Sequence, residues 1–460
     1  MPQQTTPKPR ARIGRLPAAL ANHTPQIIMR RPDSLRRYQR NARKHPPQQI
    51  ALIKSSMVSF GFMNPMLLDR NDEIIAGHGR LEAALELGLE VVPTVQASHL
   101  SESQVRAYRL ADNKIAEKSE WDEGLLQIEL SALVDLDAAG ELDFDIGAIG
   151  FETAELDLLI DQPDATEEAE VAPLPKPDPI SRLGDLWILG NHKILCGSAL
   201  DVSTYKHLLS NEIARLTITD PPYNVPVAGH IRDTASGHRE FAMASGEMSN
   251  EEEFAAFLHT FLTLARDRSA PGSLIMSFMD WRHIAALDQA ADRAGLDHIN
   301  LCVWVKTNGG MGSLYRSQHE LCGVYRAPGG AHLNNVQLGK HGRYRTNVWQ
   351  YAGVNTFRRG RVSDLIDHPT VKPTAMIADA IRDVTNRDDI VLDPFGGSGS
   401  TLLAAERSGR RARLIELEPR YVDVAIRRWQ DMTGHNAEHA DTGETWNDRT
   451  NRLQEEVFHE

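Results

Sequence analysis

A segment near the carboxyl end of the chain has the pattern of a strand, a glycine-rich turn, a helix and a second strand. The apolar run Ile390–Asp393 ends in an acid, and the turn PFGGSG at 394–399 follows it. A helix is predicted to begin near Thr401 and to stop at Gly409, and the next strand, at 413–416, again ends in an acid. Glycine at a strand-to-helix turn lets the backbone bend sharply and approach a ligand closely. The pattern therefore predicts an α/β domain with a mostly parallel sheet.

The acid that ends the second strand, Glu416, lies 23 residues after Asp393. In nucleoside-binding βαβ units, an acid at this place accepts hydrogen bonds from a ribose diol. A glycine-rich turn by itself is also compatible with a dehydrogenase. However, the chain has no G-x-G-x-x-G motif, and a dinucleotide site would leave a second motif without a role.

The second motif is Asp220-Pro221-Pro222-Tyr223, which follows the β-rich run LTIT at 216–219. The run predicts that the Asp220 carboxylate lies at the carboxyl end of a strand, where open α/β sheets bind their ligands. Because proline lacks an N–H and has a fixed φ, the Pro221 carbonyl can point into the cleft beside Asp220. Two adjacent acceptors suit an exocyclic amine, and Tyr223 offers a flat face for stacking on a base. An ordinary turn is the alternative, and the presence of both motifs in one chain argues against it.

Composition restricts the class of protein. The 460 residues predict two to four domains at about 100–200 residues per domain, and 41% hydrophobic with 25% charged residues is typical of a globular chain. No apolar run approaches the ~18–20 residues of a membrane span, and the N-terminus has no signal-peptide core, so we expect a cytoplasmic protein. Cys196, Cys302 and Cys322 are too few and too scattered for a disulfide framework or a zinc knuckle, so no metal site is expected.

Changes in composition along the chain predict its domain boundaries. Residues 1–25 are expected to form a flexible tail, and 26–160 a small α/β domain with a helical extension. The stretch 161–170 has five acids and no base, and VAPLPKPDP follows with four prolines, so an extended linker is predicted at 161–180. Residues 181–433 alternate strands and helices, and 434–460 is expected to be a polar, frayed tail.

Residues 181–433 resemble the S-adenosylmethionine-dependent DNA amino-methyltransferases of the permuted class called β. In that class the catalytic D-P-P-Y precedes the F-x-G-x-G cofactor turn, as Tyr223 precedes Phe395 here. A third match is HPTVKP at 368–373, which is similar to the H-P-T-x-K-P before the cofactor strand. Softer matches are Trp304-Val305-Lys306, His319-Glu320 and Asn347-Val348-Trp349.

The resemblance implies a Rossmann-like domain that uses S-adenosylmethionine to methylate DNA. The target base would be swung out of the duplex, Asp220 and the Pro221 carbonyl would accept hydrogen bonds from its amine, and the methyl group would pass directly to that nitrogen. The implied catalytic residues are Asp220, Pro221, Pro222 and Tyr223. The implied cofactor-binding residues are Asp393, Pro394, Phe395, Gly397, Gly399 and Glu416.

Aspartate rather than serine before Pro-Pro-Tyr favours adenine N6 over cytosine N4, although both amines fit the same acceptors. Two alternatives therefore stay open: a cytosine N4 methyltransferase, and a ParB-like DNA-binding protein whose methyltransferase half is vestigial.

The chain departs from the family pattern at one place, after the strand at 193–196. In the family the corresponding strand is often followed by Gly-Asp, and the aspartate helps to hold the adenosine. Here Gly197-Ser198 stands there, and Asp201 is the candidate substitute.

A local excess of positive charge lies between the two motifs, at 306–361. Nine lysines and arginines there face the single acid Glu320, which gives the segment about +8 in a chain of −13, and aromatic residues are interleaved with them. A solvated charged surface is the alternative, but such a surface normally mixes signs. The β class has its target-recognition region in this interval, so we expect contacts with DNA phosphates and guanine edges. The candidate DNA-binding residues are Lys306, Arg316, Lys340, Arg343, Arg345, Arg358, Arg359 and Arg361.

The sequence IIAGHGR at 74–80, followed by LEAALELG, resembles the ParB/sulfiredoxin-like domain. Free amides at a helix start and the Arg80 guanidinium favour an anion, so Gly77, His78, Gly79 and Arg80 form a candidate phosphate or nucleotide site. Helix-start packing of Arg80 is the alternative. Sulfiredoxin chemistry is rejected because His78 stands where a cysteine would be needed, and an accessory DNA-binding role is expected. The expected partner is double-stranded DNA and not a membrane, while a homodimer and a nucleotide at this domain stay open.

Overall fold

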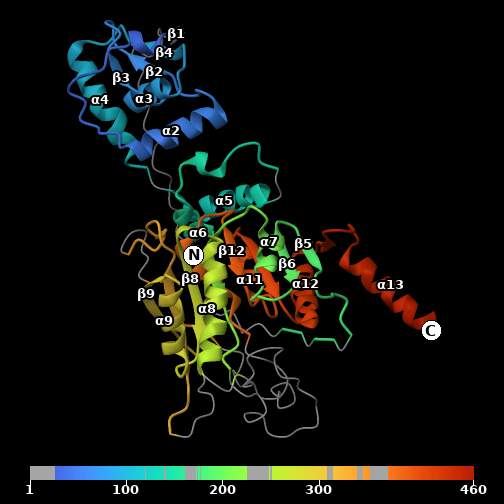
Figure 1. Ribbon diagram of the computed structural model, residues 1–460. Coiled ribbons are helices and arrows are strands. Elements are labelled where there is room, and N and C mark those ends of the chain that lie inside the picture. Colours follow the sequence, from blue (N-terminus) through green and yellow to red (C-terminus); the bar gives the residue numbers. More distant parts are fainter. Residues whose placement is uncertain are drawn as a thin grey trace, which may run out of the picture. The chain divides into compact units, whose positions relative to one another are not determined.

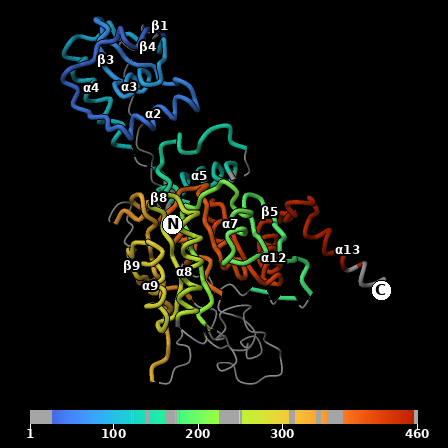
Figure 2. Tube along the Cα trace, in the orientation of Figure 1, coloured from blue at the N-terminus to red at the C-terminus, as the bar shows by residue number. Residues whose placement is uncertain are grey.

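The computed structural model divides the chain into two compact units, Met1–Glu152 and Thr153–Glu460, whose elements are coloured along the sequence in Figures 1 and 2. The structure describes residues 26–119, 121–138, 141–160, 172–173, 175–176, 178–224, 248, 251–307, 314–338, 345–352 and 371–459. The expected tail at 1–25 and most of the expected linker at 161–180 lie outside these described residues.

The first unit is built on a four-stranded sheet with the order β1-β4-β2-β3. Its strands are β1 (Ile27–Arg30), β2 (Met66–Leu68), β3 (Ile74–Ala76) and β4 (Val92–Gln96). Its helices are η1 (Pro32–Ser34), α2 (Pro47–Phe60), α3 (His78–Glu86), α4 (Glu102–Ala116), α5 (Glu123–Ala138) and η2 (Ile146–Ile149). A small core of Leu35, Met66, Leu68, Ile74, Leu81, Ala84 and Val92 lies between α3 and the sheet.

The helix α2 has a recognisable sequence signal at each end. It begins at Pro47, because proline is favoured in the first turn of a helix, where its missing N–H costs nothing. It ends at Gly61, whose φ of 79° suits glycine.

The second unit contains a ten-stranded sheet with the order β11-β9-β10-β8-β7-β12-β13-β6-β5-β14. Its strands are β5 (Leu186–Leu189), β6 (His192–Cys196), β7 (Ala214–Thr219), β8 (Ser269–Met279), β9 (Asp297–Val305), β10 (His319–Arg326), β11 (Val348–Gln350), β12 (Ile390–Asp393), β13 (Arg411–Glu416) and β14 (Glu438–His439). The central strands β8, β7, β12, β13 and β6 run parallel, and antiparallel strands flank them on both sides. The predicted α/β class with a mostly parallel central sheet is confirmed.

Helices cover both faces of this sheet. They are α7 (Val202–Leu209), α8 (Glu251–Asp267), α9 (Ile284–Arg293), α10 (Thr374–Val384), α11 (Ser400–Arg407) and α12 (Pro419–Thr433). One buried core joins α7, α8 and α9 to the sheet, and a second joins α10, α11 and α12 to its other face. The yellow helices α8 and α9 lie beside β8 and β9 in Figure 1. The result is a three-layer α/β/α domain.

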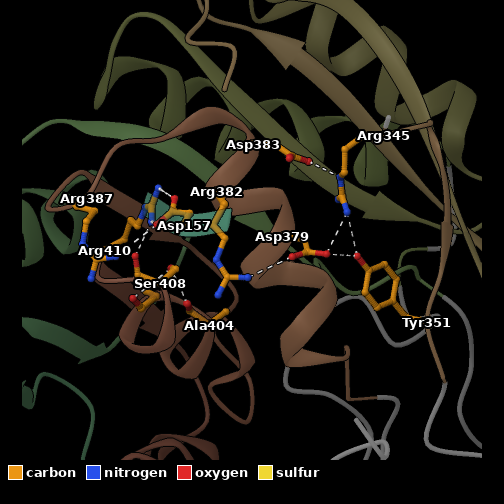
Figure 3. A network of polar contacts seen from close by, with 11 residues as sticks. Asp157, Arg345, Tyr351, Asp379, Arg382, Asp383, Arg387, Ala404, Ser408 and Arg410 are labelled. Atoms are coloured by element: carbon orange, nitrogen blue, oxygen red, sulfur yellow. Dashed lines mark hydrogen bonds and ion pairs between the residues drawn. The ribbon is translucent and has the colours of Figure 1, made fainter. Parts of the chain in front are cut away.

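The helix α6 (Thr153–Ile160) belongs to the second unit, although the sequence analysis placed the boundary after residue 160. Its Asp157 is buried against Arg410, whose Nη2 lies 2.9 Å from Oδ2, and against Arg387 at 3.4 Å (Figure 3). The boundary was wrong because an ion pair between residues so distant in the chain leaves no local pattern.

The carboxyl-terminal segment is folded where a frayed tail was predicted. β14 pairs with β5, and α13 (Trp446–His459) follows it. The Trp446 side chain is buried, and its Nε1 donates to Asp423 Oδ1 at 3.3 Å. One buried tryptophan in a polar segment anchors the end of the domain, which average polarity could not reveal.

The three cysteines are buried and unbonded. Across the described ranges, no helix is long and apolar enough to cross a membrane.

Candidate active site

The carboxyl ends of three neighbouring strands carry the residues that the motifs singled out. β7 ends immediately before Asp220, β12 ends at Asp393, and β13 ends at Glu416. The three strands are adjacent and parallel, so these acids follow one another along one edge of the sheet. The chain passes from β7 to its neighbour β8 on one side and from β12 to its neighbour β13 on the other, so the carboxyl ends of β7 and β12 form a topological switch point, where open α/β sheets bind ligands.

Both carboxylate oxygens of Asp220 accept hydrogen bonds from within the protein. The Tyr223 hydroxyl donates to Oδ1 at 2.6 Å, and the Lys372 ammonium donates to Oδ2 at 2.5 Å. Asp220, Pro222 and Tyr223 are half-buried, and Pro221 is buried. A carboxylate has about four lone-pair positions, so Asp220 is held in one orientation and can still accept another donor.

Lys372 lies between two carboxylates. Its Nζ is also 3.0 Å from Oε2 of Glu320, which is on β10. Burial alone would lower the pKa of Lys372, but Asp220 and Glu320 outweigh burial and raise it. Burial likewise opposes the charge of Glu320, but Lys372 and Lys306 lower the pKa of Glu320 to about 2. Lys306 donates to Oε1 of Glu320, so the charges alternate from Asp220 through Lys372 and Glu320 to Lys306.

Tyr223 is also part of this arrangement. Its hydroxyl lies 3.4 Å from Oε2 of Glu320. Burial, together with the charges of Asp220 and Glu320, raises the pKa of Tyr223 well above its usual value. The hydroxyl therefore stays protonated and can donate to Asp220.

Lys372 and Glu320 both lie in sequence motifs, but the motifs predict no role for either side chain. Asp220 and Lys372 are 152 residues apart, and they meet only when the turn after β7 and the segment before α10 reach the same edge. The available signal was an acid directly before the apolar middle of a strand, as Glu320 is in β10.

Asp393 joins three segments below this edge. Its Oδ1 accepts from the Thr219 hydroxyl at 2.7 Å and from the Phe395 N–H at 3.1 Å, and its Oδ2 accepts from the Thr401 hydroxyl at 2.6 Å. Burial raises the pKa of Asp393 to about 6 against the effect of these bonds. Asp393 is a predicted cofactor contact, whereas in the structure its buried carboxylate has internal partners that shape the turn.

Three more of the predicted cofactor residues pack against the protein interior and shape the turn. The Phe395 ring packs edge-on against Phe261 of α8, with 5.1 Å between the ring centroids. Gly399 has a φ of 85°, and a Cβ there would lie 2.8 Å from the Cβ of Ala425 on α12. Pro394 is buried. Glycine is therefore required at 399 by backbone conformation and helix packing.

Gly397, in the turn after β12, and Glu416, at the end of β13, are both half-buried. The Gly397 N–H donates to Oε2 of Glu416 at 2.8 Å, and the Glu418 N–H donates to Oε1 at 2.8 Å. Burial raises the pKa of Glu416 to about 7 in spite of both bonds. A Cβ at Gly397 would have no neighbour nearer than 4.0 Å, so this part of the turn is open. A carboxylate with free lone pairs beside an open glycine turn fits a ribose diol.

Asp201, the candidate substitute for the family aspartate, has a structural role of its own. It is exposed and is the N-cap of α7, where its Oδ1 accepts from the Ser203 N–H at 2.8 Å. These hydrogen bonds to Ser203 lower the pKa of Asp201, as is usual at a helix N-cap.

Three of the predicted DNA-binding residues are described, and they differ in their surroundings. Arg316 is exposed. Lys306 is paired with Glu320. Arg345 is surrounded by acids of α10, with 2.9 Å to Asp383 and 3.0 Å to Asp379 (Figure 3). The candidates outside the described residues are Lys340, Arg343, Arg358, Arg359 and Arg361.

Arg345 is therefore half-buried and held by two acids of α10, and its contact with DNA stays a prediction. Burial opposes its charge, but Asp383, Tyr351 and Asp379 raise its pKa above the usual value. The sequence showed an excess of positive charge in this segment but could not show that two aspartates of α10 face one of its arginines.

In the first unit, Gly77 is the N-cap of α3 with a φ of 108°. Arg80 donates from Nη1 to the Asn64 carbonyl at 2.7 Å, which is the packing role named as the alternative. Burial, followed by the charge of His45, lowers the pKa of His78 to about 4, and its Nε2 is buried without a partner among the described residues. The anion role of Gly77, His78, Gly79 and Arg80 stays a prediction.

Comparison with known proteins identifies relatives of both units. A family model described as DNA methylase, of the N6/N4 class, matches residues 214–427, and one described as ParB-methyltransferase HTH domain matches 124–183. The Escherichia coli (strain K12) protein YubD, named as a methylase, is 30% identical over 204 residues, which is 44% of this chain and 76% of that protein.

Two further proteins are similar to parts of the chain. The Escherichia coli (strain K12) protein YnaK, named for a ParB-like nuclease domain, is 42% identical over 79 residues, which is 17% of this chain and 91% of that protein. A solved structure from Thermus thermophilus, titled as a DNA modification methylase complexed with S-adenosyl-L-methionine, is 22% identical. It covers 55% of this chain and 96% of its own, with a TM-score of 0.39.

Proposed function

The chain belongs to the DNA methylase family of the N6/N4 class, and on that premise we propose that it methylates the exocyclic N6 amine of adenine in double-stranded DNA. The methyl donor of this family is S-adenosylmethionine. The observation that carries the proposal is the position of Asp220, which is oriented at the end of β7 and separated by one strand from Glu416 at the end of β13.

The residues at this edge fit the methyl donor. Glu416 would accept hydrogen bonds from the ribose hydroxyls, since two backbone N–H groups hold its carboxylate and leave lone pairs free. Gly397 would lie against the donor, because a side chain there would enter open space. When bound, S-adenosylmethionine supplies an electrophilic methyl group. Asp393, Phe395 and Gly399 would keep the turn in shape rather than contact the donor.

Asp220 would act on the amine of the target base. Its carboxylate and the Pro221 carbonyl are acceptors, so the amine would donate one N–H to each, which orients the nitrogen lone pair for attack. Tyr223 is half-buried, and its ring would stack on the base. The amine is paired and out of reach inside a duplex, so the base must first leave the stack. Orientation and electrostatics would supply most of the rate.

The choice of adenine rests on one residue type. Asp220, rather than a serine, precedes Pro-Pro-Tyr, which favours adenine N6. Cytosine N4 is the second candidate, because its amine has the same two N–H donors. A vestigial methyltransferase half is disfavoured because Asp220 and Glu416 keep their partners.

The first unit would add DNA affinity. Residues 124–183, which begin in α5 of the first unit and include α6 of the second, match a ParB-methyltransferase HTH domain. This match supports an accessory role in DNA binding, since helix-turn-helix modules place a helix in the major groove. The predicted domain boundaries stay part of this proposal, except that α6 is assigned to the second unit.

Mass spectrometry of nucleosides tests the proposed reaction. Unmethylated genomic DNA is incubated with S-adenosylmethionine and either the wild-type protein or Asp220→Ala, and donor binding is measured for both proteins. N6-methyladenine with the wild type alone is the expected result. N4-methylcytosine would correct the base, and no product with intact donor binding would contradict the proposed reaction.

A further inference from the structure

The ammonium group of Lys372 is enclosed on all sides. Its Nζ contacts Asp220 Oδ2 at 2.5 Å, Glu320 Oε2 at 3.0 Å and the Tyr223 hydroxyl at 3.5 Å, which accounts for three donors. The same atom lies 5.1 Å from the centroid of the Phe278 ring and 5.9 Å from that of Trp304. The Lys372 side chain is 5% exposed. A lysine in such a position cannot exchange partners freely.

The charges around Lys372 are balanced only as a set. Asp220 and Glu320 both face it, so without the ammonium group two carboxylates would share a partly dry site. Lys306 neutralises Glu320 from its other side but contacts Asp220 in none of the described pairs. Like charges in close proximity favour protonation of one of them. A protonated Asp220 would be a weaker acceptor for an amine.

We propose that Lys372 is a positioning residue which, balanced by Glu320, holds Asp220 as an oriented, ionised acceptor and sets the acidic limit of methyl transfer. This inference rests on the proposed function, because it assigns a task to the partner of Asp220. It acts through Asp220, whose Oδ2 it holds while the Tyr223 hydroxyl holds Oδ1.

Other titratable groups face the same site and must be separated from this effect. Burial raises the pKa of the Cys322 thiol well above its usual value, so the thiol stays neutral. Asp393 on β12 has a pKa of about 6, and Glu416 a pKa of about 7. Both acids are unchanged in every variant below. Saturating donor and DNA remove the contribution of Glu416 to binding.

The test is the dependence of kcat on pH for the wild type, Lys372→Met, Glu320→Gln and the double variant. The acid limb is the range of pH in which kcat falls as the solution becomes more acidic. In Lys372→Met this limb should move up by about 1–3 pH units, the size of shift that one adjacent charge produces. Adding Glu320→Gln should move the limb back down, because the second carboxylate is then gone. Glu320→Gln alone should leave the limb at or below its wild-type position.

A packing role would give a different pattern. Lys372→Met would then lower kcat by the same factor at every pH, and Glu320→Gln would not reverse the loss; that result would overturn the inference. Lys193→Met is the matched control, since Lys193 also pairs with a carboxylate, Glu212, but lies at the start of β6, away from the carboxyl ends. Its acid limb should equal that of the wild type.

A second measurement does not depend on turnover. The loss of Tm in Lys372→Met should be largest near neutral pH and shrink as the pH falls toward about 2, where the Glu320 carboxylate takes up a proton. A loss of Tm that is independent of pH would contradict the charge role. If the wild type makes no methylated base, the proposed function is contradicted. If the wild type is active and the acid limb of Lys372→Met lies at the same pH as that of the wild type, only this inference is contradicted.

Discussion

The backbone N–H of Gly397 donates to Oε2 of Glu416 at 2.8 Å, which ties the glycine-rich turn after β12 to the acid at the end of β13. The bond links the two halves of the predicted donor site and presents the remaining lone pairs of the carboxylate. It therefore predicts what a change of this side chain should do.

Replacing Glu416 with glutamine should weaken S-adenosylmethionine binding by ~10–100-fold, because charge-assisted hydrogen bonds contribute ~1.5–3 kcal/mol. Isothermal titration calorimetry measures the Kd directly. Glu418→Gln is the matched control, since Glu418 meets the Glu416 side chain through its backbone N–H. An unchanged Kd in Glu416→Gln would remove Glu416 from the donor site.

Donor affinity should also depend on pH through Glu416. Burial raises the pKa of Glu416 to about 7, and the ribose hydroxyls need the ionised form as acceptor. The affinity should therefore increase as the pH rises from about 6 to about 8, through this pKa. In Glu416→Gln the affinity should be nearly flat over the same range. A wild-type Kd that does not change with pH would argue against an ionised Glu416 in the complex.

Asp157→Ala should destabilise the second unit by about 3–5 kcal/mol, because the buried Arg410 would lose its carboxylate. Chemical denaturation measures the free energy of unfolding. Asp297→Ala is the control, since it breaks an ion pair with Arg326 whose side chains are 32% and 60% exposed, and should cost less than about 1 kcal/mol. Equal costs for the two variants would contradict the structural role of α6.

Arg345 and Arg316 should separate stability from DNA binding. Arg345→Ala should lower Tm, since Asp379 and Asp383 would face each other without the guanidinium, and should leave the salt dependence of DNA binding unchanged. Arg316→Ala should reduce the slope of log K against log salt by about 1, as loss of one phosphate contact does. A flatter slope for Arg345→Ala with an unchanged Tm would reverse these assignments.

The sequence was sufficient to predict elements that depend on the interactions of neighbouring residues. The run Ile390–Asp393 forms β12 with the predicted bounds, because three apolar residues and an acid before a turn of proline and glycines suit a short buried strand. The order of the two motifs, together with the acids at 393 and 416, likewise predicted the class of enzyme and the edge of the sheet that carries the site.

Roles inside the site were harder to predict. Asp393 and Glu416 both end strands, and the sequence predicts that both bind the cofactor. The structure separates them, because Asp393 meets two threonine hydroxyls from β7 and α11, whereas Glu416 meets only backbone N–H groups and stays half-buried.

By itself, the sequence determined the α/β architecture, the two motifs and the family, because periodicity, glycine turns and motif spacing are properties of neighbouring residues. Only the tertiary structure decided which charged residues meet: Lys372 with Asp220 and Glu320, Asp157 with Arg410, and Arg345 with α10. The physical reason is that a buried charge requires a partner within about 4 Å in space. Folding supplies that partner from anywhere in the chain.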